Sequence, residues 1–197
     1  MSQRQQQQIA ELAARLIVER GYVDWQLAKT KAATQLGFWA NTPLPKNSEI
    51  EAALATYQRT FGGQGLEQHL AALRQTAIEA LTFFAQYSPL ITGPTVETSA
   101  TLHSRIEIHV FSDWSDAISV YLDDNQIPYQ LQDKRYKTTQ GDEEWLPGFS
   151  FLAGEIETLV TVFPENRRNQ PPCSPVTGQA MTRWSKSQYH ASMATTR

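Results

Sequence analysis

The sequence lacks most of the patterns that assign a chemistry at once. Its one cysteine, Cys173, allows no disulfide within the chain, which is typical of a reducing compartment. It contains no G-x-x-x-x-G-K-[ST], G-x-G-x-x-G, C-x-x-C or H-E-x-x-H pattern. P-loop, dinucleotide-binding, zinc-finger and H-E-x-x-H protease chemistry therefore have no support in the sequence.

Long apolar runs and an excess of positive charge are also missing. No apolar run approaches the roughly 20 residues that span a bilayer, and the start, MSQRQQQQIAEL, has no apolar signal-peptide core. Lys and Arg number 17 against 20 Asp and Glu, a net charge of −3, which does not favour binding to nucleic acid. We expect a cytoplasmic protein with no membrane association and no nucleic-acid partner.

The first part of the chain has the apolar spacing of helices. Gly21 is placed to end the first helix and Asp24 to cap the second, while Asn47 or Ser48 caps the third. Apolar residues three and four apart predict helices over 9–20, 25–36, 48–61 and 66–87.

From residue 89 onward the pattern changes to that of short strands. RIEIHVF alternates with period two, with Ile106, Ile108 and Val110 on one face. The segment 140–148 predicts a turn-rich connection, and 165–184 an irregular arm followed by a frayed tail. The expected strands are 89–93, 105–111, 127–138, 149–154 and 157–163, with one helix over 113–125.

These elements predict an α+β fold in three parts. Residues 1–62 form a helical N-terminal unit and residues 165–197 an irregular C-terminal arm and tail. Between them, 63–164 form a small mixed sheet with packed helices, in the order α-β-β-α-β-β-β.

The segment from Gly93 to the strand RIEIHVF resembles the active-site region of nucleotidyltransferases of the polymerase-beta kind. In that family a Gly-Ser pair is followed by a strand that carries Asp-x-Asp. Gly93 matches the glycine, Pro94 stands at the serine, and Ser104 matches the small polar residue before the acids. Arg105 and Glu107 fall on the two aspartates. The two positions share one strand face because side chains two apart point the same way.

The resemblance implies a catalytic pair of carboxylates and a divalent metal, Mg²⁺ or another ion. Glu107 is the retained acid, and Glu157, or less favourably Glu155, is the candidate for a third carboxylate on a later strand. However, a guanidinium at Arg105 cannot ligate Mg²⁺, and Pro94 has neither a hydroxyl nor an N–H for a phosphate. We therefore expect a degenerate site that binds a nucleotide or a phosphorylated small molecule without standard two-metal transfer.

Two other interpretations stay open at this point. Glu107 and His109, joined by His103 and Glu157, have the residue types of a rewired metal site that would support a metal-dependent phosphoryl-transfer enzyme. Alternatively, Arg105, Glu107 and His109 face solvent or a covering helix and pair with one another. The protein is then a non-catalytic interaction module, acting as a homodimer or with a protein partner. The candidate substrate-binding residues are Gly93, Ser104, Arg105, His109, Lys134 and Arg135.

Overall fold

The computed structural model describes residues 3–22, 24–38, 42–97, 99–114 and 116–194. The chain divides into two compact units, one of residues 1–70 with 98–104 and the other of 71–97 with 105–197. This division differs from the three predicted parts, because helix α4 (Gly63–Phe83) continues from one unit into the other and the C-terminal segment joins the sheet. Within these ranges no helix has both the length and the apolar character needed to cross a bilayer.

The first unit consists of helices α1 (Gln3–Arg20), α2 (Trp25–Gln35) and α3 (Asn47–Phe61) with the start of α4. Helix α1 packs against both α2 and α3. The residues of this contact surface are almost fully buried: Ile9, Ala13, Ile17, Ala28, Ala32, Ile50 and Leu54. The stripe that the spacing predicts on α2 is wrong at its two ends, since Leu27 and Leu36 are 44% and 38% exposed.

The helix ends of the first unit follow the capping chemistry of the sequence. Gly21 takes a positive φ of 68° directly after α1, and the Asp24 carboxylate accepts from the N–H groups of the second and third residues after it. The predicted cap of α3 was placed too late. The cap residue is Lys46, whose N–H donates to Glu49 Oε2 at 2.7 Å.

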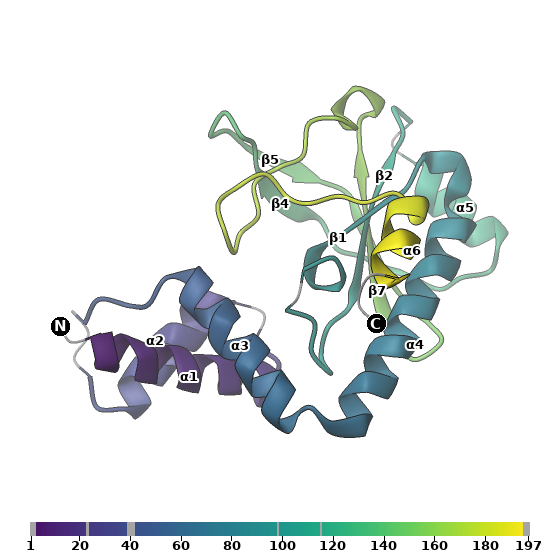
Figure 1. Ribbon diagram of the computed structural model, residues 1–197. Coiled ribbons are helices and arrows are strands. Elements are labelled where there is room, and N and C mark those ends of the chain that lie inside the picture. Colours follow the sequence, from purple (N-terminus) through teal and green to yellow (C-terminus); the bar gives the residue numbers. More distant parts are fainter. Residues whose placement is uncertain (1–2, 23, 39–41, 98, 115, 195–197) are drawn as a thin grey trace. The chain divides into compact units, whose positions relative to one another are not determined.

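The second unit contains a five-stranded mixed sheet (Figure 1), which confirms the α+β class. Its strand order is β1-β2-β7-β6-β3, and β2 and β7 are parallel while every other neighbouring pair is antiparallel. The strands are β1 (Leu90–Thr92), β2 (Ile106–Phe111), β7 (Ile156–Phe163), β6 (Gly148–Ala153) and β3 (Gln130–Leu131). The central pair β2–β7 is thus flanked on both sides, which places β2 inside the sheet.

The single strand predicted over 127–138 is wrong, because the chain leaves the sheet in the middle of it. Strand β3 pairs with β6, whereas β4 (Lys134–Lys137) forms a separate two-stranded sheet with β5 (Glu143–Leu146). The predicted turn over 140–148 also contains β5. The strand was missed because its sequence, EEWL, is mainly polar and only Leu146 is buried. We call β4 and β5 together the ribbon.

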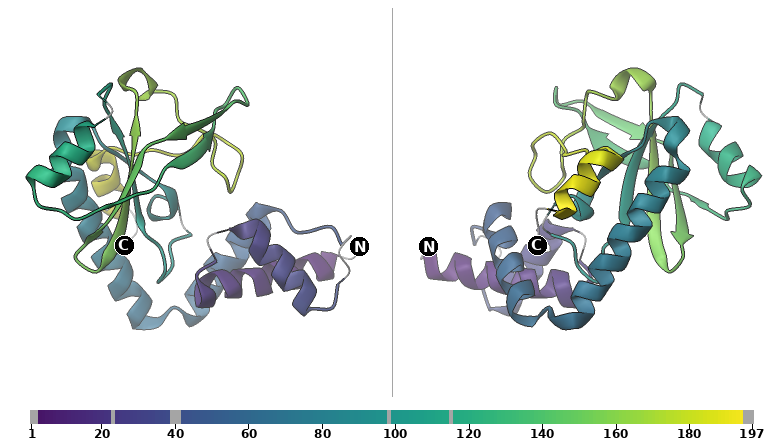
Figure 2. Two further views of the ribbon diagram at one scale, coloured as in Figure 1. Left: turned by 180° about the vertical axis from the view of Figure 1, so that it is seen from behind. Right: turned by 45° about the vertical axis from the view of Figure 1, so that its right-hand side comes forward.

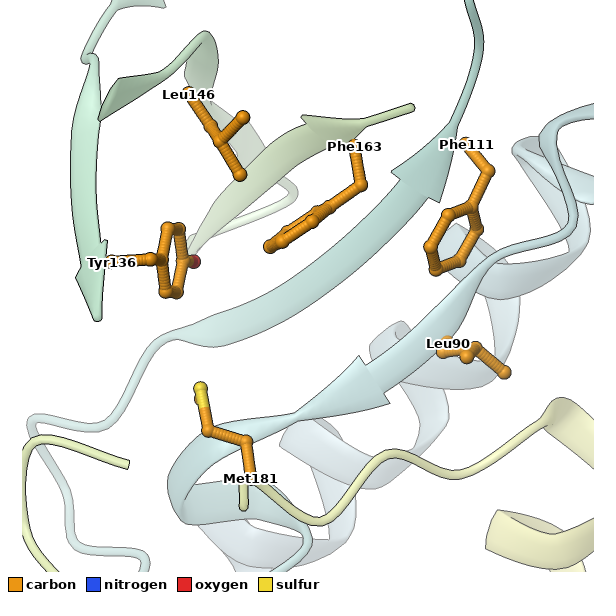
Figure 3. Close-up of a cluster of buried hydrophobic side chains, with 6 residues drawn as sticks. All are labelled: Leu90, Phe111, Tyr136, Leu146, Phe163 and Met181. Carbon is orange, nitrogen blue, oxygen red and sulfur yellow. The ribbon is translucent and has the colours of Figure 1, made fainter. Parts of the chain in front are cut away.

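Helices and ribbon cover opposite sides of the five-stranded sheet (Figure 2). Helices α4, α5 (Ala117–Asp124) and α6 (Lys186–Ala194) lie on one side. There Phe84, just after α4, contacts Phe151 of β6 and Tyr121 of α5. The ribbon lies on the other side. Figure 3 shows the apolar cluster under the ribbon, made of Leu90, Phe111, Tyr136, Leu146, Phe163 and Met181.

The C-terminal segment is more ordered than the sequence predicts. The Ile91 and Trp184 backbones exchange two hydrogen bonds, of 2.8 and 2.9 Å, and Thr92 Oγ1 donates to the Thr182 carbonyl at 2.7 Å. This arm, residues 170–185, therefore lies along the outer edge of β1. The expected frayed tail is wrong up to residue 194, because α6 follows the arm and buries Tyr189 against the unit. Residues 195–197 lie outside the described part.

Candidate functional site

Both faces of strand β2 are buried. The register sets Ile106 beside Thr158 and Thr158 beside Phe151, which is the face that the helices cover. The opposite face carries Glu107 and His109, which are only 9% and 1% exposed. The interpretation that these two side chains face solvent is therefore wrong, and the ribbon and the arm cover them in place of a helix. The expected pairing within the strand face is confirmed for Arg105 and Glu107.

Glu107 is held by two cations. Lys134 Nζ of the ribbon lies 2.6 Å from its Oε2, and Arg105 Nε lies 3.2 Å from its Oε1. Burial alone raises the pKa of a carboxyl group, but the charges and hydrogen bonds of Lys134 and Arg105 outweigh it, so the pKa of Glu107 is lower than its usual 4.5. The carboxylate is thus ionised and neutralised inside the protein.

Arg105 connects this carboxylate to a second one. Its Nη1 lies 3.4 Å from Glu157 Oε1 on β7, and the Ser150 hydroxyl donates to the same oxygen at 3.1 Å. The side chain of Glu157 is 49% exposed, whereas that of Glu107 is 11% exposed. We call Arg105, Glu107, Lys134 and Glu157 the charge cluster. It contains two positive and two negative groups, which come from three parts of the sequence: residues 105–107, Lys134 on β4 and Glu157 on β7.

Gly93 lies directly against this cluster. It has a φ of +72°, and a Cβ at this position would stand 3.4 Å from the Glu107 carboxyl carbon. Its carbonyl accepts from the N–H groups of Val96 and Glu97, which closes the short turn that contains Pro94. The glycine and the retained acid of the motif are therefore neighbours in space, although 14 positions of chain separate Gly93 and Glu107.

His109 lies on the same face of β2 but is fully buried and has other partners. Its Nδ1 accepts from Arg183 Nε at 2.8 Å, and its Nε2 lies 3.0 Å from the Tyr136 hydroxyl. Burial, and then the positive charges of Arg183 and Lys134, lower the pKa of His109 well below 6.5. The imidazole is neutral and makes hydrogen bonds on both nitrogens.

The residues of the predicted metal site do not fit a metal ion. Both Glu107 oxygens contact cationic side chains, and both His109 nitrogens have hydrogen-bond partners. In the described ranges no three His, Cys, Asp or Glu side chains are grouped so that they could hold a metal. The two carboxylates proposed for catalysis, Glu107 and Glu157, both contact Arg105 instead.

Three further residues singled out in the sequence, Arg135, Ser104 and His103, make contacts of their own outside the charge cluster. Arg135 points to the outer face of the ribbon, where it is exposed and pairs with Glu143 at 3.3 Å. Ser104 belongs to the first unit, where its Oγ accepts from the Thr101 N–H at 2.8 Å. His103 belongs to that unit too, and its ring lies beside Gly21.

Sequence reasoning missed Arg183, Tyr136 and Thr161. Tyr136 lies two residues after Lys134 on one strand face, so the alternation in KRYK could have shown that both point inward. Arg183 sits in an arm without periodicity, and nothing in the sequence marks it. Its guanidinium lies 4.5 Å over the Phe163 ring, and burial lowers its pKa to about 10.

Comparison with known proteins adds nothing to these assignments, which rest on the geometry of the site. A scan against protein-family models gave no match, and neither curated proteins nor solved structures gave a similar chain.

Proposed function

We propose that the second unit is a nucleotidyltransferase-like fold with a degenerate site, which binds a nucleotide or another phosphorylated small molecule without two-metal transfer. The observation that carries this proposal is the 2.6 Å contact between Lys134 Nζ and the buried carboxylate of Glu107. In a degenerate site of this kind, the Lys134 ammonium group takes the place of the hard divalent cation that the family's chemistry needs. The site has kept its charge balance and replaced the metal by side chains.

The ligand class follows from the geometry around Arg105. Its contacts with Glu107 and Glu157, 3.2 and 3.4 Å long, exceed the roughly 2.7–2.9 Å of strong charge-assisted hydrogen bonds. Glu157 is half-exposed and can turn toward solvent. A phosphate group can then take its place on the guanidinium, since a planar fork of N–H donors matches phosphate oxygens.

The surroundings of the cluster support a small ligand. Gly93 has no side chain beside Glu107, where a Cβ would be in van der Waals contact. Lys134 and Arg105 are each 23% exposed, so part of both cations is accessible from solvent. The glycine and the two cations therefore lie together beside Glu107, and part of each cationic side chain reaches solvent.

Thermal unfolding in the presence of ATP, CTP and pyrophosphate tests this proposal. A ligand that binds only the folded state at about 100 times its Kd stabilises it by about 2.7 kcal/mol. We expect a higher melting temperature with phosphate-containing ligands in EDTA. Arg105→Ala removes the shift, whereas the matched variant Arg135→Ala, on the outer face of the ribbon, keeps it. No shift, or a shift that needs Mg²⁺, would contradict the proposal.

A second candidate function is a non-catalytic interaction module, and one observation favours it. Trp145 is 68% exposed on the outer face of the ribbon, beside the cross-strand Arg135. Large exposed aromatic side chains are typical of protein interfaces. Sedimentation of the wild type and of Trp145→Ser tests it for self-association: a wild-type dimer that Trp145→Ser dissociates supports the module, and a monomer at every concentration contradicts its homodimeric form.

A further inference from the structure

The hydrogen bonds around His109 have one direction only. A guanidinium has donors and no acceptor, so the Arg183 Nε–H, 2.8 Å away, requires an unprotonated Nδ1 on His109. The single proton of the neutral imidazole therefore lies on Nε2 and is donated to the Tyr136 hydroxyl at 3.0 Å. Because Tyr136 accepts there, its own proton is free for Thr161 Oγ1 at 3.2 Å. We call this series, Arg183 to His109 to Tyr136 to Thr161, the hydrogen-bond chain.

The hydrogen-bond chain crosses four segments of the second unit. It begins in the arm, passes through β2 and β4 and ends in β7. Of these, only β2 and β7 are neighbours in the five-stranded sheet, and the partner of β4 in a backbone ladder is β5. One backbone hydrogen bond, from the Cys173 N–H to the Lys137 carbonyl at 2.7 Å, ties the end of β4 to the arm. Over the sheet itself β4 is held through side chains, of which Tyr136 is buried and hydrogen-bonded at both sides.

Tyr136 and Lys134 point to the same side of β4. The Lys134 ammonium lies 5.3 Å from the centre of the Tyr136 ring, and reaches Glu107 at 2.6 Å. A shift or rotation of β4 that frees Tyr136 also moves Lys134 away from the carboxylate, since alternate residues of a strand move together.

Arg183 is held in place independently of His109. Its Nη1 lies 3.2 and 3.4 Å from the carbonyl oxygens of Arg167 and Arg168, and its guanidinium stacks on Phe163. A group fixed by other contacts can impose a tautomer on its acceptor, whereas a mobile one would adapt to it.

We propose that Arg183 is a positioning residue, which fixes the tautomer of His109 and, through Tyr136, holds Lys134 in place over Glu107. The effect on ligand binding rests on the proposed function. The effects on His109 and on β4 do not, because they follow from the hydrogen-bond chain alone. The C-terminal arm then helps to position the charge cluster, although none of the four residues of the cluster belongs to the arm.

The direct test is the tautomer of His109, read from ¹H–¹⁵N correlations of the imidazole at neutral pH. The wild type is expected to show the Nε2–H form only, and Arg183→Leu to show a population of Nδ1–H. Arg168→Leu is the matched control, since it removes an exposed guanidinium of the segment that leads into the arm and leaves the tautomer unchanged. An Nδ1–H form in the wild type, or an unchanged tautomer in Arg183→Leu, would overturn the proposal.

Amide hydrogen exchange of β4 and binding of pyrophosphate test the second step. Arg183→Leu and Tyr136→Phe should both speed exchange in β4, and weaken binding about two- to tenfold, the effect of one lost hydrogen bond. Tyr136→Phe keeps the Nε2–H tautomer, and it decides the second step if Arg183→Leu does not fold. Unchanged exchange in Tyr136→Phe overturns this step. If the wild type binds no phosphate ligand at all, the proposed function fails, while the tautomer and exchange results still decide the role of Arg183.

Discussion

Two positions on the same face of β2, Glu107 and His109, show how differently adjacent sites on one strand are used. Glu107 contacts two cations that are each 23% exposed, at a place that solvent reaches. His109 is 1% exposed, and its partners are the arm and the inner side of the ribbon. Around Glu107, a ligand can replace one of the ion-pair partners of the cations. Around His109, the hydrogen bonds fix the side chains in one arrangement. The difference arises because the arm and the inner side of the ribbon bury His109, whereas solvent reaches the cations beside Glu107.

Removal of the charge of Glu107 should have the largest effect on stability. Glu107→Gln leaves Lys134 and Arg105 without their buried partner, which costs about 3 kcal/mol of unfolding free energy. The matched variant Glu143→Gln breaks an exposed pair with Arg135 and costs at most about 1 kcal/mol. Urea unfolding measures both. Equal costs would mean that the cluster is no more than a surface ion pair.

The pH dependence of stability should isolate His109. Because its pKa in the folded protein is well below 6.5, the native state stays neutral while the unfolded chain binds a proton as the pH falls below about 6.5. The stabilisation is complete above this pH and is lost below it, by up to about 1.4 kcal/mol per pH unit.

The pKa of Glu107 is lowered below 4.5, so its own contribution is lost only in more acidic solution. Unfolding of the wild type and of His109→Gln between pH 7 and 5 therefore measures the histidine alone. Gln is the appropriate replacement because its amide can both accept and donate, as the neutral imidazole does. The wild type should lose stability faster than the variant, and parallel curves would contradict the assignment.

The smallest effect is expected for the contact between Gly93 and Glu107. Gly93→Ala places a side chain on a residue with a φ of +72°, which costs about 1–2 kcal/mol. Gly154→Ala is the control, since its φ is +65° and a Cβ there meets nothing within 4 Å. The difference between the two variants isolates the contact with Glu107, and we expect Gly93→Ala to be the less stable by a few tenths of a kcal/mol and to bind pyrophosphate more weakly.

How much of this the sequence could predict depends on the kind of interaction. The helices of the first unit follow from apolar spacing, Gly21 and Asp24, because these features act within a few residues of chain. The strand RIEIHVF was also predicted, from its alternation. The burial of the second face of β2 could not be predicted, since it depends on the ribbon and the arm, which follow from Lys134 onward and have no regular apolar period.

The candidate site divides in the same way. Glu107 and Gly93 were selected from a local motif, and the structure places them in contact range. Lys134 was selected as part of a basic group, but its contact with Glu107 needs the break between β3 and β4, which a continuous strand over 127–138 does not allow. Arg183 acts through one hydrogen bond from an irregular arm, and such a contact leaves no trace in sequence periodicity.

Binding of pyrophosphate to Glu157→Gln tests most directly whether cations have replaced the metal. If Glu157 occupies the place of the ligand on Arg105, its neutralisation strengthens binding in EDTA, and Mg²⁺ adds nothing. Glu155→Gln, an exposed carboxylate in the adjacent turn, should bind as the wild type does. If Glu157→Gln instead abolishes a binding that requires Mg²⁺, the carboxylate is a metal ligand and our interpretation of the charge cluster is wrong.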